Sequence, residues 1–151
     1  MSSLADIDRL LGMSAWRQHR GERELQAARQ RLVLVQRELA AMDEHEGSLR
    51  ALLGSHRAEN RVLDHWQLLE TLRRQAVIRR QIQLLALERG PLHEQRVQLD
   101  QAVHQAQQGL LRLRRKHVKY VGLRQRLGRE YRLAHLRRDE GEIEDLTGMK
   151  G

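Results

Sequence analysis

The chain has 151 residues with no Cys, no Phe, one Pro and only two Trp and two Tyr, so neither a disulfide framework nor a large aromatic core is expected. Leu, Arg, Gln, Glu and Ala dominate instead, and these straight-chain residues favour long α-helices with a thin core. The net charge of +8 would attract an anionic partner such as nucleic acid, anionic lipid or an acidic protein surface.

The N-terminal stretch carries two acids before any apolar run and lacks the features of a signal peptide. No apolar run approaches the roughly 20 residues that a membrane-spanning helix needs. The lack of cysteine does not point to an oxidising compartment. We therefore expect a cytoplasmic protein that is not inserted in a membrane.

A heptad-like repeat occupies the first third of the chain. Fifteen positions spaced alternately by three and four residues run from Leu4 to Leu53, and eleven of them are apolar. A 3.5-residue repeat maintained over this length is typical of a coiled-coil seam and predicts a first helix over about residues 4–54. The seam is expected to be weaker at three consecutive positions, Ser14, Gln18 and Gly21.

A polar stretch separates this pattern from a second one. Gly54 and Ser55 form a helix stop signal, because Gly adopts left-handed backbone angles at little cost and Ser competes for local backbone hydrogen bonds. Asp64 is predicted to cap the next helix, since its carboxylate can accept hydrogen bonds from the amides of the first turn. The sequence therefore predicts a turn over about residues 55–63, where the chain folds back on itself.

The second pattern is longer and predicts a helix over about residues 64–138. Its a/d spacing is clear between Leu99 and Ala134, although His117 and Arg124 are poor seam residues. Upstream, the same register is continued by Leu68, Ile78, Ile82, Leu85 and Leu92. A second apolar stripe runs beside it, at Leu69, Leu72 and Ala76. This stripe predicts either a broader contact between the helices or a second surface for a partner.

The single proline and the C-terminal residues set limits on this second helix. Pro lacks an amide donor and clashes with the preceding turn, so a kink is expected near Gly90-Pro91. Residues 139–151 contain few large apolar side chains and are predicted to form an acidic disordered tail. We therefore expect residues 1–138 to form a single all-α domain, a long two-helix antiparallel coiled-coil hairpin whose second helix is the longer.

Positive charge is concentrated in the second helix. Residues 112–138 contain eleven Lys or Arg and one acid, Glu130. At a rise of about 1.5 Å per residue the second helix would extend past the first and carry this charge with it. A solvated helix face and a docking site for an acidic protein surface are both open interpretations. Nucleic acid is not the expected partner, because no helix-turn-helix, zinc knuckle or aromatic stacking platform accompanies the charge.

Motifs for catalysis and cofactor binding are missing from the sequence. The eight histidines never lie three or four residues apart, so a zinc site on neighbouring helical turns is not expected. No phosphate-binding loop, nucleophile elbow or dinucleotide-binding glycine motif occurs. The sequence therefore predicts no enzyme, no metal and no cofactor.

The region around the turn resembles a known family. Residues 57–82 are similar to the turn and second-helix start of the SpaM/InvI group of type III secretion proteins, within the wider YscO and FliJ-like stalk family. The shared stretch reads RAENRVLDHWQLLETLRRQAVIRRQI. The resemblance implies a cytoplasmic, non-catalytic hairpin at the base of the secretion apparatus, in the centre of the hexameric secretion ATPase. It looks like the gamma stalk of rotary ATPases.

The resemblance also implies partners. In that family the end with the chain termini enters the ATPase, the turn side reaches the ring of the major export gate protein, and some relatives bind secretion chaperones. The residues expected to bind the export gate are Arg57, Glu59, Asn60, Arg61, Trp66, Leu69, Leu72, Arg73 and Arg79. The residues expected to bind the ATPase are Leu4, Ile7, Leu11, Arg124, Arg126, Arg129, Arg132 and Arg137. We expect an elongated monomer.

Two other functions fit the same pattern. A basic coiled coil would bind nucleic acid or an anionic membrane surface with an affinity that falls steeply with salt. A structural scaffold would form coiled-coil oligomers, whereas the stalk would be a monomer.

Overall fold

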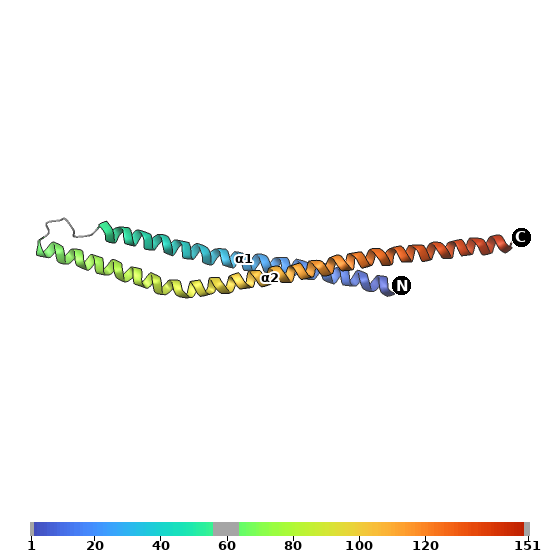
Figure 1. Ribbon diagram of the computed structural model, residues 1–151, viewed down its shortest axis with the longest axis horizontal. Helices are drawn as coiled ribbons and strands as arrows, with labels where there is room; N and C mark the ends of the chain where they lie inside the picture. Colours follow the sequence, from blue (N-terminus) through green and yellow to red (C-terminus); the bar gives the residue numbers. More distant parts are fainter. Residues whose placement is uncertain (1, 56–63, 150–151) are drawn as a thin grey trace. The chain divides into compact units, whose positions relative to one another are not determined.

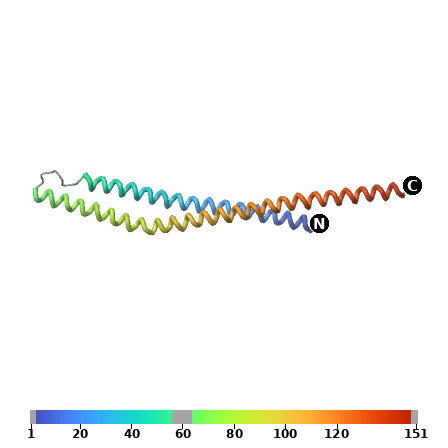
Figure 2. Tube along the Cα trace, in the orientation of Figure 1, coloured from blue at the N-terminus to red at the C-terminus, as the bar shows by residue number. Residues whose placement is uncertain are grey.

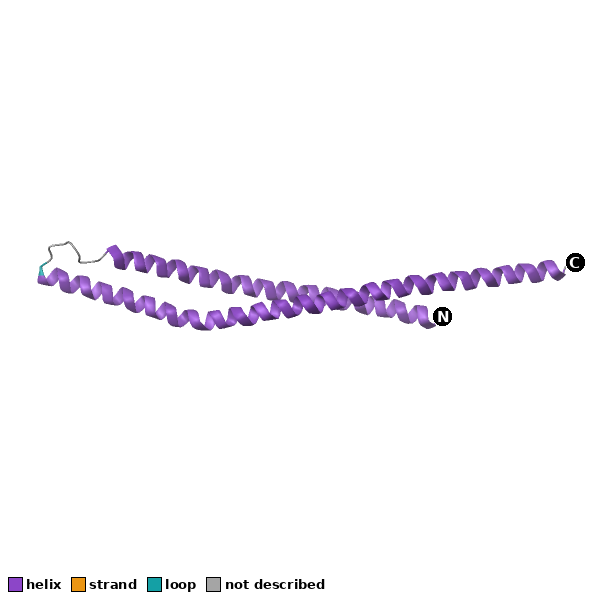
Figure 3. Ribbon diagram, viewed as in Figure 1, coloured by secondary structure: helices purple, strands orange, loops and turns teal. Residues whose placement is uncertain are grey.

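Two α-helices make up the part of the chain that the structure describes, residues 2–55 and 64–149. In the computed structural model α1 spans Ser2–Ser55 and α2 spans His65–Met149 (Figure 1 and Figure 3). No strand occurs within these two ranges. The predicted all-α, two-helix fold is confirmed, and the expected end of the first helix and start of the second agree closely with the observed ones.

The chain divides into two compact units, each of which contains a stretch of both helices. Unit 1 comprises Met1–Leu25 and Gln105–Gly151, and unit 2 comprises Gln26–His104. The colours of Figure 2 follow the chain, so that the blue start of α1 and the orange-to-red part of α2 belong to unit 1. Each unit therefore pairs helical segments that are distant in sequence.

The two helical segments of unit 1 run antiparallel. The hydroxyl of Ser14 lies 3.1 Å from Nδ1 of His117. Gly21, seven residues further along α1, packs against Leu110, seven residues further back along α2. Seven residues forward on α1 thus match seven residues back on α2, as expected for an antiparallel coiled coil. This register confirms the predicted hairpin pairing.

The predicted seam of α1 is the face that packs against α2. None of the fifteen predicted positions from Leu4 to Leu53 is exposed. Five of them hold buried apolar side chains, Ile7, Leu25, Val35, Leu39 and Leu49. Burying one such side chain stabilises a fold by about 1.5–3 kcal/mol. The core is nevertheless thin, because no side chain in the described ranges is less than 2% exposed.

The seam of α2 follows the prediction over its middle part. Each predicted position from Leu99 to Leu127 is buried or half-buried, whereas Tyr131 and Ala134 are exposed. The predicted seam is therefore too long at this end, because the packing between the helices of unit 1 fades beyond Leu127.

The first turns of α2 differ from the predicted seam. Leu68 is exposed, and the register that runs back from Ile78 reaches Gln75, which is buried although it is polar. Leu72 and Ala76, from the second predicted stripe, are exposed. Leu69, the third residue of that stripe, is half-buried. The stripe therefore contributes little to the contact between the helices, which favours the alternative of a surface for a partner.

Local hydrogen bonds mark the helix ends that face the turn. The Ser55 hydroxyl donates to the Leu52 carbonyl over 2.8 Å at the end of α1. At the start of α2 the amide of Gln67 donates to Oδ1 of Asp64 over 2.7 Å, and the Asp64 amide donates to Oε1 of Gln67. This reciprocal pair is a capping box, so the predicted N-cap at Asp64 is confirmed.

The proline does not interrupt the helix. Pro91 lies inside α2, and the helix continues on both sides of it. Pro91 is exposed and Leu92, the next predicted seam position, is half-buried, so the heptad register continues past the proline. The predicted kink near Gly90-Pro91 stays a prediction.

The expected disordered tail is wrong for the residues that the structure describes, because α2 continues to Met149. The His135 ring lies 3.9 Å from the Asp139 carboxylate, four residues on, and the Thr147 hydroxyl donates to carbonyls one turn back. Acidic composition suggested disorder, but no proline follows residue 91, and each glycine costs a helix only about 1 kcal/mol. The helix can therefore continue without a second helix beside it.

Candidate interaction surfaces

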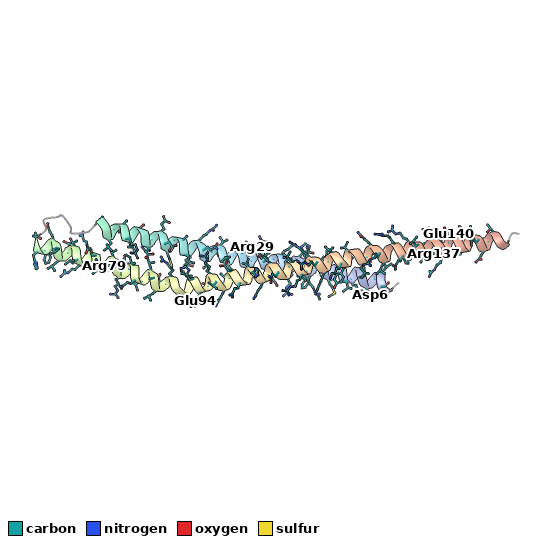
Figure 4. The ribbon with its side chains drawn as sticks, in the orientation of Figure 1. Asp6, Arg29, Arg79, Glu94, Arg137 and Glu140 are labelled. Atoms are coloured by element: carbon teal, nitrogen blue, oxygen red, sulfur yellow. The ribbon has the colours of Figure 1, made fainter. Side chains whose placement is uncertain are left out.

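The first surface lies on unit 2, at the start of α2. Trp66 is 69% exposed, and together with Leu69, Glu70 and Arg73 it lines a shallow hollow. Arg79, labelled in Figure 4, is exposed further along the same helix. The structure thus brings together Trp66, Leu69 and Arg73, three of the residues predicted to bind the export gate. The other predicted residues of the turn, Arg57, Glu59, Asn60 and Arg61, lie outside the described residues.

A second hollow adjoins this one and is built from both helices. Its lining residues are Leu52, Glu70, Arg73, Arg74, Val77 and Ile78. Exposed Leu52 and Val77 supply apolar surface, and the arginines supply charge beside it. Neither apolar residue stands out in the sequence: Val77 lies outside both predicted stripes, and only the pairing of the helices places Leu52 of α1 beside this part of α2. We call these two hollows, together with the exposed Leu72 and Arg79 of α2, the turn-side surface.

The residues predicted to bind the ATPase fall into two groups in unit 1. Leu4, Ile7 and Leu11 belong to the packed seam, and Ile7 is only 4% exposed. Arg124 is half-buried, and its Nε donates to Oδ1 of Asp8 over 2.8 Å. These four side chains therefore hold the two helices together. The remaining four are exposed on α2, Arg126, Arg129, Arg132 and Arg137.

A polar layer replaces apolar packing inside unit 1. Ser14 is only 5% exposed and faces the half-buried His117. One heptad away, a Cβ added to Gly21 would lie 3.3 Å from Cδ1 of Leu110. The helices approach closely here, so positions that looked weak in the sequence are packed in the fold.

An ion-pair cluster lies in the seam of unit 2. Arg89 Nη2 is 2.9 Å from Glu46 and 3.0 Å from Asp43, and Arg50 also donates to Glu46. The hydrogen bond from Arg89, and then the one from Arg50, lowers the pKa of the Glu46 carboxyl. The sequence alone does not reveal this cluster, because Arg89 and Glu46 lie 43 residues apart in the chain and only the register of the two helices brings them together.

Metal-binding clusters and membrane-spanning stretches do not occur among the described residues. These residues contain no group of three or more His, Cys, Asp or Glu side chains that could hold a metal ion. Neither described helix has a stretch with the length and hydrophobicity needed to cross a bilayer.

A comparison with protein families decides what kind of protein carries these surfaces. The family model described as "Salmonella surface presentation of antigen gene type M protein" matches residues 5–147. The chain belongs to this family. The SpaM family is a non-catalytic component of type III secretion, so this chain is a virulence-linked, type III secretion-related protein and not an enzyme. Neither a curated protein nor a solved structure matches the chain.

Proposed function

We propose that this SpaM-family protein is the central stalk of a type III secretion export apparatus. It would couple the hexameric secretion ATPase to the ring of the major export gate protein, at the cytoplasmic base of the apparatus. One observation carries the proposal: two separate exposed surfaces, one apolar and arginine-rich on unit 2 and one strongly basic on unit 1, lie on a non-catalytic two-helix protein. A coupling protein needs two such independent binding surfaces.

The turn-side surface is assigned to the export gate. Trp66 and Leu72 expose apolar area that water solvates poorly, and Arg73 lies beside Trp66 in one hollow. Exposed aromatic residues and arginines are the side chains most often found at the centre of binding interfaces. Arg57, Glu59, Asn60 and Arg61 stay part of this assignment through the family resemblance.

Charge reversal on the turn-side surface tests this assignment. Arg73→Glu and Arg79→Glu should abolish secretion, because each places repulsive charge in the contact, while the helical circular dichroism signal stays unchanged. Arg31→Glu makes the same charge change on an exposed position of α1 and should leave secretion intact. Normal secretion by both turn-side variants would rule out the assignment.

The exposed arginines of unit 1 are assigned to the ATPase. Arg126, Arg129 and Arg132 present positive charge that would speed association with an acidic surface, an effect that added salt should weaken. Ile7 is buried and Leu4 and Leu11 are half-buried, which suits a supporting role, since they hold α1 against this part of α2. Purified protein should co-elute with the ATPase or stimulate it. No effect at a stoichiometric excess would count against this half of the proposal.

Secretion chaperones are a further proposed partner, because some members of the wider stalk family bind them. Val33 and Leu34 of unit 2 are exposed beside Arg29 and Arg37 and form an apolar and basic face on α1. This face lies apart from the residues assigned to the export gate. A chaperone bound there could be carried without blocking the turn-side surface.

A further inference from the structure

The last part of α2 has no packing partner in unit 1. Residues 131–148 are exposed, apart from half-buried Gly141, and we call them the exposed segment. It carries four large apolar side chains that are each more than half exposed, Leu133, Leu136, Ile143 and Leu146. Leu133, Leu136 and Ile143 recur at heptad-like spacing and so share one side of the helix. An apolar stripe of this kind is what a coiled-coil partner would cover.

The charge of the exposed segment changes sign along its length. Its basic half contains Arg132, Arg137 and Arg138, and its acidic half contains Asp139, Glu140, Glu142, Glu144 and Asp145. Figure 4 labels Arg137 and Glu140, which lie next to each other at this boundary. An antiparallel copy would bring the basic half of one segment beside the acidic half of the other. We propose that the exposed segment pairs in this way with the exposed segment of a second copy of this chain.

Unit 1 supplies the geometry for such a pairing. Gly21 packs on Leu110, where an added Cβ would lie 3.3 Å from Cδ1. The flanking ion pair then joins Glu22, one residue after Gly21, to Arg114, four residues after Leu110, at a distance of 3.6 Å. An antiparallel pair of helices with a heptad seam should repeat these offsets.

In the exposed segment, oppositely charged residues occupy the positions that correspond to Glu22 and Arg114 in unit 1. If Ile143 packs on Leu133 of the second copy, Glu144 follows Ile143 by one residue and Arg137 follows Leu133 by four. These two side chains therefore come together as an ion pair. On the other flank, the same register brings Arg132 beside Asp139. The two-fold symmetry of a dimer repeats both pairs, so four ion pairs surround the apolar contacts.

Charge also selects this register over its neighbour. A shift of one heptad would place Leu133 against Leu136, which is a good apolar contact. It would also place Arg137 beside Arg137 of the second copy, and Arg132 beside Arg132 of the second copy. Like charges at such flanking positions destabilise a coiled coil. In the favoured register Leu136 packs only on the stem of Glu140, so the dimer is expected to be weak and reversible.

This inference goes beyond the proposed function, since it describes the chain free in solution and not in its secretion complex. It departs from the expected elongated monomer for the free chain, whereas the chain bound to the ATPase as a stalk would be the monomer. Arg132 and Arg137 belong to the surface assigned to the ATPase. Pairing of two copies would therefore cover part of that surface until the ATPase displaces the second copy.

Sedimentation velocity of the full chain over a range of concentrations tests the proposal. The wild-type chain should show a reversible monomer–dimer equilibrium. Arg137→Glu or Glu144→Arg should each weaken the dimer about tenfold, because two attractive pairs become repulsive. An equimolar mixture of these two variants should dimerise again, since the mixture restores opposite charges at both pairs.

The control is Arg138→Glu, which makes the same charge change one residue later, on the side of the helix away from Leu133 and Ile143. It should dimerise like the wild-type chain. The proposal is overturned if the wild-type chain stays monomeric at every concentration, if the mixture of variants does not associate, or if Arg138→Glu weakens the dimer as much as Arg137→Glu. Circular dichroism of each variant checks that the helices are retained.

Discussion

Units 1 and 2 share one heptad spacing but fill it differently. Unit 2 buries Val35, Leu39, Leu49 and Leu85 and adds the ion-pair cluster around Arg89. Unit 1 buries Ile7, Leu25 and Leu110, but it places Ser14 and His117 in its seam and leaves residues 131–148 exposed. Apolar layers supply most of the stability of a coiled coil, whereas polar layers lower it. We therefore expect unit 2 to be the firmer support and unit 1 the unit that opens more easily.

The largest effect should come from the apolar seam of unit 2. Leu39→Ala removes a side chain that is 5% exposed and should lower the free energy of unfolding by about 2–4 kcal/mol in urea titrations followed by circular dichroism. Leu34→Ala makes the same change at a position that is 62% exposed and should cost less than about 0.5 kcal/mol. Equal losses from the two variants would contradict the assigned seam.

A smaller effect should come from the ion-pair cluster. Arg89→Met leaves the carboxylates of Glu46 and Asp43 without their shared partner and should destabilise the chain less than Leu39→Ala does. Arg50→Met removes the second hydrogen-bond donor to Glu46, an arginine more exposed than Arg89, and should cost less stability than Arg89→Met.

The same cluster predicts a pH dependence. Arg89 lowers the pKa of folded Glu46, so this contribution is full above the pKa of the unfolded carboxyl and is lost as the pH falls through the folded value. Urea titrations in the acid range should therefore show a smaller fall in stability for Arg89→Met than for the wild-type chain. An identical acid dependence would mean that the cluster does not act through Glu46.

The smallest effects should distinguish two glycines in unit 1. Gly12→Ala has nothing within 4 Å of the added Cβ and should stabilise the helix by about 0.5–1 kcal/mol. Gly21→Ala should gain less or lose stability, because its Cβ would press on Leu110 and Leu113. A larger gain at Gly21, measured by thermal unfolding, would show that the helices of unit 1 are not closely packed there.

Much of the fold could be predicted because its determinants are local or periodic. The 3,4 spacing in α1 includes every buried position from Leu4 to Leu53. The Asp64 cap needs only the next turn of helix. Gln75 and Arg89 could not be placed in the same way, because polar residues enter a seam only when the opposite helix makes room or offers charge.

The residues that make up the candidate surfaces are set more by how α1 and α2 pair than by the sequence pattern of either helix. Trp66 and Arg73 could be selected through the family resemblance, but Leu52 joins them only because α1 lies beside that part of α2. The acidic composition of residues 139–151 predicts disorder, whereas α2 continues to Met149, because composition says little about a helix that needs no partner to form. The change from positive to negative charge along residues 131–148 can be read from the sequence, but it indicates a pairing register only because the segment is helical.

The most direct test of the stalk is a binding assay with the purified secretion ATPase and the cytoplasmic ring of the export gate. The wild-type chain should recover both together. Arg73→Glu should lose the gate ring and keep the ATPase, whereas Arg129→Glu should lose the ATPase and keep the gate ring. The account is contradicted if the wild-type chain binds neither partner, or if either variant loses both partners while its circular dichroism shows intact helices.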